Sequence, residues 1–366
     1  MFKIKKSIRK YGLEYLELPD MISNISTMLR VLALNIDSRN KKRYGFYSFT
    51  ETSVSNFISI FRRNLQNLVD RFQDCDSRTV KGSRFSINMR KALRNVKIRA
   101  ISYWVLLNVN GVLYVIQPIV TPGHHLAVDT YIILGLQPMH KSPNFEIAST
   151  MTGMAVIFIC FTVANVSGFL ILIIGYIEAQ MLSLSEEMTH LWADANNHCQ
   201  KTMKELKIVN EYVKRHLIDI IGRHALNVSL LQGIEDTMRG PNAVGFLFLI
   251  VGLVAELLGG LKNTMLQVPF TLTQLGVDCY LGQKIMDANM RFERAVYACK
   301  WENFDQFNKK IVLVMLQNSQ KTMKLTAGGM AILSFEVFMN IIRSTEVMVT
   351  ASKVTFYQTW QLFQNF

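Results

Sequence analysis

Two long stretches of the chain contain no charged side chain. They run from 100 to 128 and from 147 to 177. A helix needs about 20 predominantly apolar residues to cross the hydrocarbon core of a bilayer, and each stretch is longer than that. Neither stretch alternates apolar and polar residues as a barrel strand does, so helices are expected to satisfy the backbone in lipid. The pattern therefore predicts an all-α integral membrane protein.

Five segments have the length and hydropathy expected of transmembrane helices. We expect spans at 99–120, 149–177, 241–261, 264–285 and 325–351. The first of these is expected to end at Pro118 and Pro122, and the third to begin at Pro241, because proline is favoured in the first turn of a helix. Asp278 makes the fourth segment weaker than the others.

The chain before residue 62 is harder to interpret. It holds two weakly apolar segments, near 21–36 and 45–61. One interpretation is that a helical hairpin has been shortened, either in the protein itself or in its gene model. The other is that both segments are weak spans, which insert with help from neighbouring helices. Counting both gives a seven-transmembrane-helix bundle whose first hairpin is weak or shortened.

The basic residues lie between the apolar segments and set the expected orientation. Residues 62–99 hold eleven Lys or Arg against three Asp, whereas 121–148 hold one Lys and no Arg. Lys and Arg are enriched in cytoplasmic loops. The loop at 62–99 and the basic N-terminus are therefore expected inside the cell, and the loop at 121–148 outside. Five spans after residue 99 then place the C-terminus outside.

These considerations divide the chain into five parts. We expect a cytoplasmic N-terminus, two weak spans and a basic cytoplasmic loop in 1–97; a transmembrane bundle in 98–285, with an outer loop at 121–148 and cytoplasmic helices at 178–239; a cytoplasmic connector in 286–324; the last span in 325–351; and an extracellular tail in 352–366.

Composition excludes several other classes of protein. The isoelectric point near 9.5 is typical of nucleic-acid-binding domains, but here the charge follows the loops, so no nucleic acid is expected. The five cysteines form no CxxC or Cys/His pair at zinc spacing. The sequence also has no Ser/His/Asp set, P-loop or GxGxxG. We therefore expect no enzyme activity, no catalytic residue, no metal and no cofactor.

A longer pattern extends from Asp278 to Met348. It begins with Cys279-Tyr-Leu-Gly-Gln-Lys-Ile285, continues through a polar connector, and ends with Leu325-Thr-Ala-Gly-Gly-Met330. The matching positions are Gly282, Tyr297, Trp301, Gln317, Ser319, Gln320, Thr326, Ala327, Gly328, Ser334 and Phe338. This succession resembles the C-terminal signature of the insect odorant receptors, which are odour-gated cation channels. The resemblance is good from 98 to 348 and poor before that.

The resemblance implies an odour-tuning receptor subunit. Such a subunit binds a small volatile apolar odorant in a transmembrane pocket. It gates a non-selective cation channel together with an odorant co-receptor subunit, as a heterotetramer. Its place would be the plasma membrane, in contact with membrane lipid, on the dendrites of olfactory sensory neurons. The alternatives are a gustatory receptor of the same superfamily, a G-protein-coupled receptor, whose N-terminus lies outside the cell, and a membrane-embedded enzyme or transporter.

Three groups of site residues follow from the resemblance. The expected ligand-binding residues, in an apolar pocket with a few polar groups, are Asn110, Gly111, Tyr114, Met154, Phe158, Phe270 and Gln274. The expected subunit anchor in the connector comprises Tyr297, Trp301, Gln317, Ser319 and Gln320. The expected pore residues of the last span are Glu346, Val347, Val349, Thr350, Ala351 and Val354.

The last span also contains residues with two readings. Thr326-Ala-Gly-Gly329 permits either a joint at the start of the pore helix or tight helix packing. Glu336, Arg343 and Glu346 face either a pore or interface, or water at a span shifted toward the membrane surface. Ala351 and Ser352 stand where the family has leucines, so a looser constriction is expected.

Overall fold

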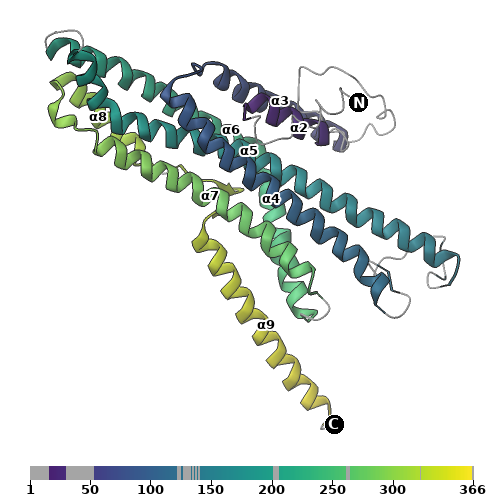
Figure 1. Ribbon diagram of the computed structural model, residues 1–366. Coiled ribbons are helices and arrows are strands. Elements are labelled where there is room, and N and C mark those ends of the chain that lie inside the picture. The colour runs from purple at the N-terminus through teal and green to yellow at the C-terminus, as the bar shows by residue number, and fades with distance from the viewer. Residues whose placement is uncertain are drawn as a thin grey trace, which may run out of the picture.

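The structure, a computed structural model, describes residues 16–29, 53–121, 125–126, 133, 136, 138, 141–200, 206–260, 264–321 and 323–364. It consists mainly of long helices (Figure 1). These are α2 (Leu18–Leu29), α3 (Ser53–Ser77), α4 (Arg84–Val120), α5 (Asn144–Gln200), α6 (Leu206–Leu258), α7 (Gln267–Tyr297), the 3-10 turn η2 (Trp301–Asn303), α8 (Gln306–Ser319) and α9 (Phe335–Gln364). The all-α membrane-type fold is confirmed, with a short two-stranded hairpin added before α9.

Three of the described helices are long and apolar enough to cross a membrane. They are α4, α5 and α6. Helices α7 and α9 have 31 and 30 residues but carry more polar side chains, among them Asp278 and Glu346. Spans at 264–285 and 325–351, and the total of seven, therefore remain predictions. The weak segments at 21–36 and 45–61 lie partly outside the described residues, as does most of the expected outer loop at 121–148.

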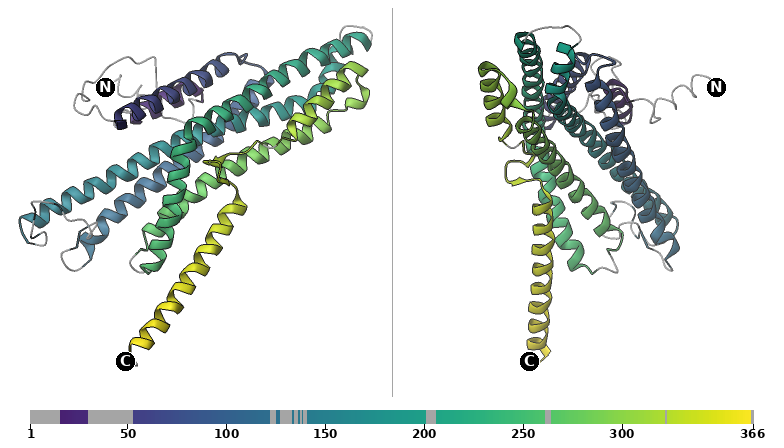
Figure 2. Two further views of the ribbon diagram at one scale, coloured as in Figure 1. Left: turned by 180° about the vertical axis from the view of Figure 1, so that it is seen from behind. Right: turned by 60° about the vertical axis from the view of Figure 1, so that its left-hand side comes forward.

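The expected spans at 149–177 and 241–261 are continuous with the expected cytoplasmic helices, in α5 and α6. Each continues through the boundary, over 57 and 53 residues. Pro241 lies inside α6 and does not begin a helix, and Pro118 likewise lies inside α4. An internal proline removes one backbone hydrogen bond and kinks a helix without necessarily ending it. Consistent with this, α6 changes direction partway along its length (Figure 2).

Helices α4 and α5 run antiparallel in close contact, and a glycine of α4 lies against a side chain of α5. A Cβ on Gly111 would lie 2.8 Å from the Sγ atom of Cys160. Small residues allow this approach between helices in lipid. Along the middle of the pair, Arg99 Nη2 lies 2.6 Å from Glu178 Oε2 and Arg99 Nη1 donates to the Tyr280 hydroxyl at 3.0 Å. These contacts join α4, α5 and α7.

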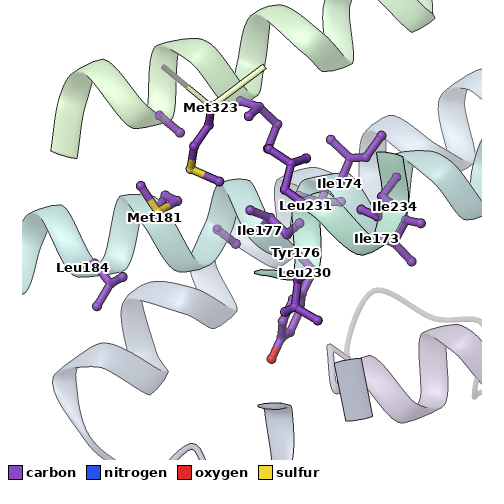
Figure 3. Close-up of a cluster of buried hydrophobic side chains, with 14 of the residues drawn as sticks. Ile173, Ile174, Tyr176, Ile177, Met181, Leu184, Leu230, Leu231, Ile234 and Met323 are labelled. Carbon is purple, nitrogen blue, oxygen red and sulfur yellow. The ribbon is translucent and has the colours of Figure 1, made fainter. Parts of the chain in front are cut away.

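A cluster of buried hydrophobic side chains joins α5 to α6. Figure 3 shows side chains of both helices converging, with Met323 from the segment before the hairpin beside them. Tyr176, Ile173 and Ile177 of α5 and Leu230 of α6 are completely buried. Burial of this kind stabilises a fold by about 25 cal/mol per Å² of apolar surface. This interface therefore holds the part of the bundle from which α7, α8 and α9 are positioned.

The start of the last span differs from the expectation. In place of a helix from Leu325, strands β1 (Thr326–Ala327) and β2 (Ala331–Ile332) form an antiparallel hairpin, and α9 begins at Phe335. Gly328 and Gly329 adopt φ angles of +66° and +81°, which strongly disfavour a side chain and interrupt a helix. Ser334 then caps α9, its hydroxyl oxygen accepting a hydrogen bond from Val337 N at 3.2 Å.

Helix α9 keeps buried side chains as far as Val349, and its C-terminal part extends away from the other helices (Figures 1 and 2). It contacts α6 and α7. The helix continues to Gln364, so the expected tail after residue 351 is helical in its described part. The far part of α9 is thus free of the other described helices, which is the arrangement of an element that packs against something outside its own bundle.

Candidate functional site

Polar side chains form a ladder between α4 and α7, and one member comes from α5. Gln267 Nε2 donates to the Tyr114 hydroxyl at 2.7 Å, and Asn110 Nδ2 donates to the Leu266 carbonyl at 3.2 Å. Two turns further along, the Tyr103 hydroxyl donates to Gln274 Oε1. We call six residues the α4–α7 cluster: Tyr103, Asn110, Tyr114, Ser167, Gln267 and Gln274.

Ser167 completes the inner end of this cluster. Gln274 Nε2 donates to the Ser167 hydroxyl oxygen at 3.0 Å, so α5 is tied to α7 at the same level. Tyr103 and Ser167 are buried, whereas Tyr114 and Gln267 are half-buried. Polar groups in a low-dielectric surrounding need such partners, since an unpaired group costs about 1–3 kcal/mol. The half-buried outer end is where a ligand would exchange hydrogen bonds with the protein most easily.

The expected ligand residues separate into two groups. Asn110, Tyr114 and Gln274 belong to the α4–α7 cluster, and Phe270 packs partly buried on the same face of α7. Gly111 faces Cys160 on α5. Met154 and Phe158, by contrast, are 68% and 51% exposed on α5. The structure does not bring these two side chains to the cluster.

Sequence reasoning missed Tyr103, Ser167 and Gln267. A signal for two of them exists in the spacing. Tyr103 and Asn110 are seven residues apart on α4, as are Gln267 and Gln274 on α7. Seven residues are close to two helical turns, so each pair shares a face. Polar residues at this spacing within apolar helices indicate facing stripes, but the partner of Ser167 could not be known before the helices were placed.

The expected anchor residues lie around η2 and α8. Ser319 is fully buried, and its carbonyl oxygen accepts a hydrogen bond from Asn289 Nδ2 at 2.9 Å. Tyr297 and Trp301 are 67% and 39% exposed, and Gln317 and Gln320 are also exposed. Ser319 therefore fixes α8 to α7, while the other four are available for contact with another molecule.

The exposed side of the connector is strongly apolar. Phe307, Leu313 and Val314 of α8 are 56%, 57% and 54% exposed. We define the anchor face as Tyr297, Trp301, Phe307, Leu313 and Val314. Cys299, between α7 and η2, is buried, and burial raises the pKa of its thiol to about 11. Contiguous exposed apolar side chains of this kind mark interaction surfaces.

The expected pore residues do not all share one side of α9. Val347 is 69% exposed, and Glu346, Thr350 and Ala351 are exposed as well. Val349 is only 9% exposed and lies one turn from the buried Thr345. Residues two apart on a helix differ by about 200° in direction, so Val347 and Val349 cannot both face one axis. The structure does not describe the side chain of Val354.

The hairpin and the start of α9 are clasped by α6 and α7. Glu235 on α6 accepts hydrogen bonds from the backbone N–H and the hydroxyl of Thr326, the latter at 2.8 Å. The backbone at Leu333 passes so close to Gly282 that a Cβ on this glycine would overlap it. The ring of Phe338 lies against Gly276 on the same helix. Helix α7 therefore carries both Gln267 and Gln274 of the α4–α7 cluster and the contacts that position α9.

Comparisons with known proteins agree with this arrangement. A family model described as 7tm odorant receptor matches residues 52–345. Odorant receptor 22b of Drosophila melanogaster is 26% identical over 159 residues, which is 39% of this chain and 38% of the relative. Odorant receptor 85b of the same species is 26% identical over 139 residues, 36% of this chain and 34% of the relative. The alignments thus span less than two fifths of either relative.

Solved structures match over almost the whole chain. The olfactory receptor OR5 of Machilis hrabei superposes with a TM-score of 0.64 at 10% identity, over 92% of this chain and 98% of that one. Its complex with eugenol gives a TM-score of 0.61 over the same shares, also at 10% identity. Identity this low shows a common fold. The matched family is one of membrane receptors and not of enzymes, as the sequence predicted. Because its model covers most of the residues and the fold agrees, this chain belongs to the insect odorant receptor family.

Proposed function

We propose that this chain is an odour-tuning subunit of a ligand-gated, non-selective cation channel, which it forms with a co-receptor subunit as a heterotetramer in the plasma membrane. Membership of the odorant receptor family supports the receptor role. The observation that carries the channel role is the double contact of α7. One helix holds Gln267 and Gln274 of the α4–α7 cluster and also clasps the base of α9 through Gly282.

The proposed ligand is a small volatile molecule with an apolar body and one polar group. Tyr114 and Gln267 supply a hydroxyl and an amide at the half-buried end of the cluster, and Phe270 supplies apolar surface. Sites of this kind are mostly apolar, and a few polar groups set orientation. Met154 and Phe158 are left out of this proposal, because their side chains point away from the cluster.

Gating follows from where α7 makes its contacts. A ligand that replaces the hydrogen bond between Tyr114 and Gln267 changes the packing of α7 on α4. The same helix meets Leu333 and Phe338 at the base of α9, and Tyr280 of α7 lies 6.2 Å from Phe335 between ring centroids. A ligand shifts an equilibrium only by binding two states differently. Here the closed and the open state of the channel would differ in the packing of α7 against the base of α9.

The proposed ion path lies along the exposed side of α9. Closed rings of related subunits place the same element of each subunit around the axis. Glu346 and Val347 occupy the side that the bundle leaves free. A ring of carboxylates favours cations, and a ring of apolar side chains gates by excluding water. The anchor face on η2 and α8 is the proposed contact between subunits.

The proposed orientation keeps the N-terminus and the basic loop at 62–99 inside the cell. This rests on the loop charges and on the positive-inside rule. Epitope tags at both ends, stained before and after permeabilisation, test it. A tag at the N-terminus that is visible on intact cells would contradict the orientation. The proposed cellular place is the dendrite of an olfactory sensory neuron.

The central experiment is co-expression of this chain with an odorant co-receptor, followed by current recordings over an odorant panel. We expect odorant-evoked, non-selective cation currents that neither subunit carries alone with the same ligand profile. The co-receptor expressed by itself is the control. Absence of any new odorant response, with both subunits at the cell surface, would contradict the proposed role as a tuning subunit.

A further inference from the structure

A groove lies between α2, α4 and α5, away from the α4–α7 cluster. It encloses about 270 Å³, and its walls include Ile101, Trp104 and Val105 of α4 and Gly168 of α5. Ile101 and Val105 are 41% and 45% exposed, so the groove opens sideways along the surface of α4. Its walls are almost entirely apolar.

The polar atoms in these walls are paired with one another. Trp104 Nε1 donates to Asn165 Oδ1 at 3.3 Å, and Asn165 Nδ2 donates to the Phe161 carbonyl at 2.7 Å. A molecule in this part of the groove therefore does not have to form hydrogen bonds with Trp104 or Asn165. A Cβ on Gly168 would meet no atom within 4 Å, although nearby glycines of α5 are tightly packed. The space beside Gly168 is open.

One end of the groove is basic. Lys97 lines it but is only 5% exposed, whereas Arg94 stands exposed one turn earlier on α4. Asp20 on α2 interacts electrostatically with Lys97, so part of its charge is balanced within the chain. Lys91 continues the basic surface of α4 beyond Arg94, and Arg90 next to it lies 3.7 Å from Glu17 in an ion pair. The balance of charge at this end remains positive.

The groove has the length and the direction of a lipid chain in one leaflet. From Lys97 to Val105 it follows α4 for about 12 Å at 1.5 Å per residue. One leaflet contributes about 15 Å of hydrocarbon, half of the bilayer core. Lys97 comes just before the apolar part of α4, where headgroups are expected. Anionic headgroups are attracted to Lys and Arg at this depth.

We propose that this groove binds an anionic phospholipid, with one acyl chain against Trp104 and Gly168 and the headgroup at the exposed Arg94, beside Lys97. The occupant is lipid because the groove opens to the side at membrane depth and its charge lies at the headgroup end. A peptide segment would bring backbone groups, for which these apolar walls offer no hydrogen-bonding partners. The site is separate from the α4–α7 cluster, so it is a lipid site in addition to the proposed odorant site.

The test uses the full chain in phosphatidylcholine nanodiscs that contain a small fraction of phosphatidylserine with a diazirine on one acyl chain. After irradiation, labelled peptides are identified by mass spectrometry. A matched probe with a choline headgroup is used in parallel. We expect the serine probe to label the segments around Trp104 and Gly168 several-fold more than the choline probe.

Three variants separate the two parts of the site. Gly168→Leu fills the open space and is expected to reduce labelling of both segments several-fold with either probe. Arg94→Gln is expected to remove the preference for serine over choline. Gly252→Leu on α6, where a Cβ also meets no atom within 4 Å, is the control and should leave labelling unchanged. Equal labelling in wild type and Gly168→Leu would overturn the groove as the site, and equal labelling by both probes in wild type would overturn the anionic headgroup.

Discussion

The backbone carbonyl of Leu333 occupies the space that a side chain on Gly282 would need. Gly282 lies in the middle of α7, and Leu333 is the last residue before the cap of α9. Leu333 is itself held by a hydrogen bond from its N–H to the Leu325 carbonyl at 2.9 Å. The contact is thus between two backbones, and neither can move aside as the end of a flexible side chain would.

Gly282→Ala is therefore expected to weaken the connection between α7 and α9. Overpacking in a close-packed contact costs about 1–3 kcal/mol, and here a rotamer change cannot relieve it. Thermal unfolding of the purified protein should show the loss, together with smaller odorant-evoked currents at equal surface density. Gly252→Ala is the control, because its Cβ meets open space and alanine favours a helix by about 0.5–1 kcal/mol. Equal stability of the two variants would contradict the clasp.

Tyr114→Phe tests the proposed odorant site. It removes one hydroxyl and leaves the Gln267 amide without its partner at 2.7 Å. For odorants with a polar group we expect a loss of potency of about 1–3 kcal/mol, and for hydrocarbon odorants little change. The measurement is the concentration for half-maximal current. Gln267→Leu added to Tyr114→Phe should cause little further loss of potency, because the effects of two residues that contact each other are not additive.

Phe158→Ala is the comparison for this site. The side chain is 51% exposed on α5 and points away from the α4–α7 cluster. We expect unchanged potency for every active odorant, with normal surface expression. A larger shift from Phe158→Ala than from Tyr114→Phe would place the ligand on the outer side of α5 and would contradict the proposed site.

These two positions show why the sequence predicted part of the site and not the rest. Lipid is as apolar as a protein core, so an aromatic residue in a span gives no sign of which of the two it faces. Phe158 and Phe270 look alike in the sequence, and the structure separates them. Polar residues are more informative, because Tyr114 and Gln274 need partners inside the bundle. The hairpin was missed for another reason: the φ angles of Gly328 and Gly329 depend on the packing around them.

The anchor face gives a prediction about assembly. Leu313 is 57% exposed on α8, so replacing it with Glu costs the isolated chain little stability. Leu313→Glu is expected to reduce co-purification with the co-receptor strongly, because a buried unpaired charge at an interface is costly. Val80→Glu, at a residue 69% exposed between α3 and α4, is the matched control. If both variants co-purify with the co-receptor as the wild type does, the anchor face is not the contact.

The thiol of Cys299 gives a prediction about pH. Burial raises its pKa to about 11, and the thiolate is the form that reacts with maleimide. At pH 8 only about one thiol in a thousand is then ionised, and the fraction rises about tenfold per pH unit up to the pKa. Labelling of Cys299, followed by mass spectrometry, should therefore be slow at pH 7–8 and faster at pH 9. Labelling in denaturant is the reference, and equal rates in the folded protein would contradict the burial.

The two faces of α9 give the sharpest prediction about the ion path. Glu346 and Val347 lie on the exposed face, whereas Val349 is 9% exposed and lies on the face with Thr345. Glu346→Gln should lower divalent block or cation preference, and Val347→Ser should raise current without odorant, since polar side chains admit water to a constriction. Val349→Ser should instead lower surface expression by placing a hydroxyl in an apolar contact, which costs about 1–3 kcal/mol. Recordings at matched surface density distinguish these outcomes. If Val349→Ser alters permeation while Glu346→Gln and Val347→Ser do not, the opposite face of α9 lines the path.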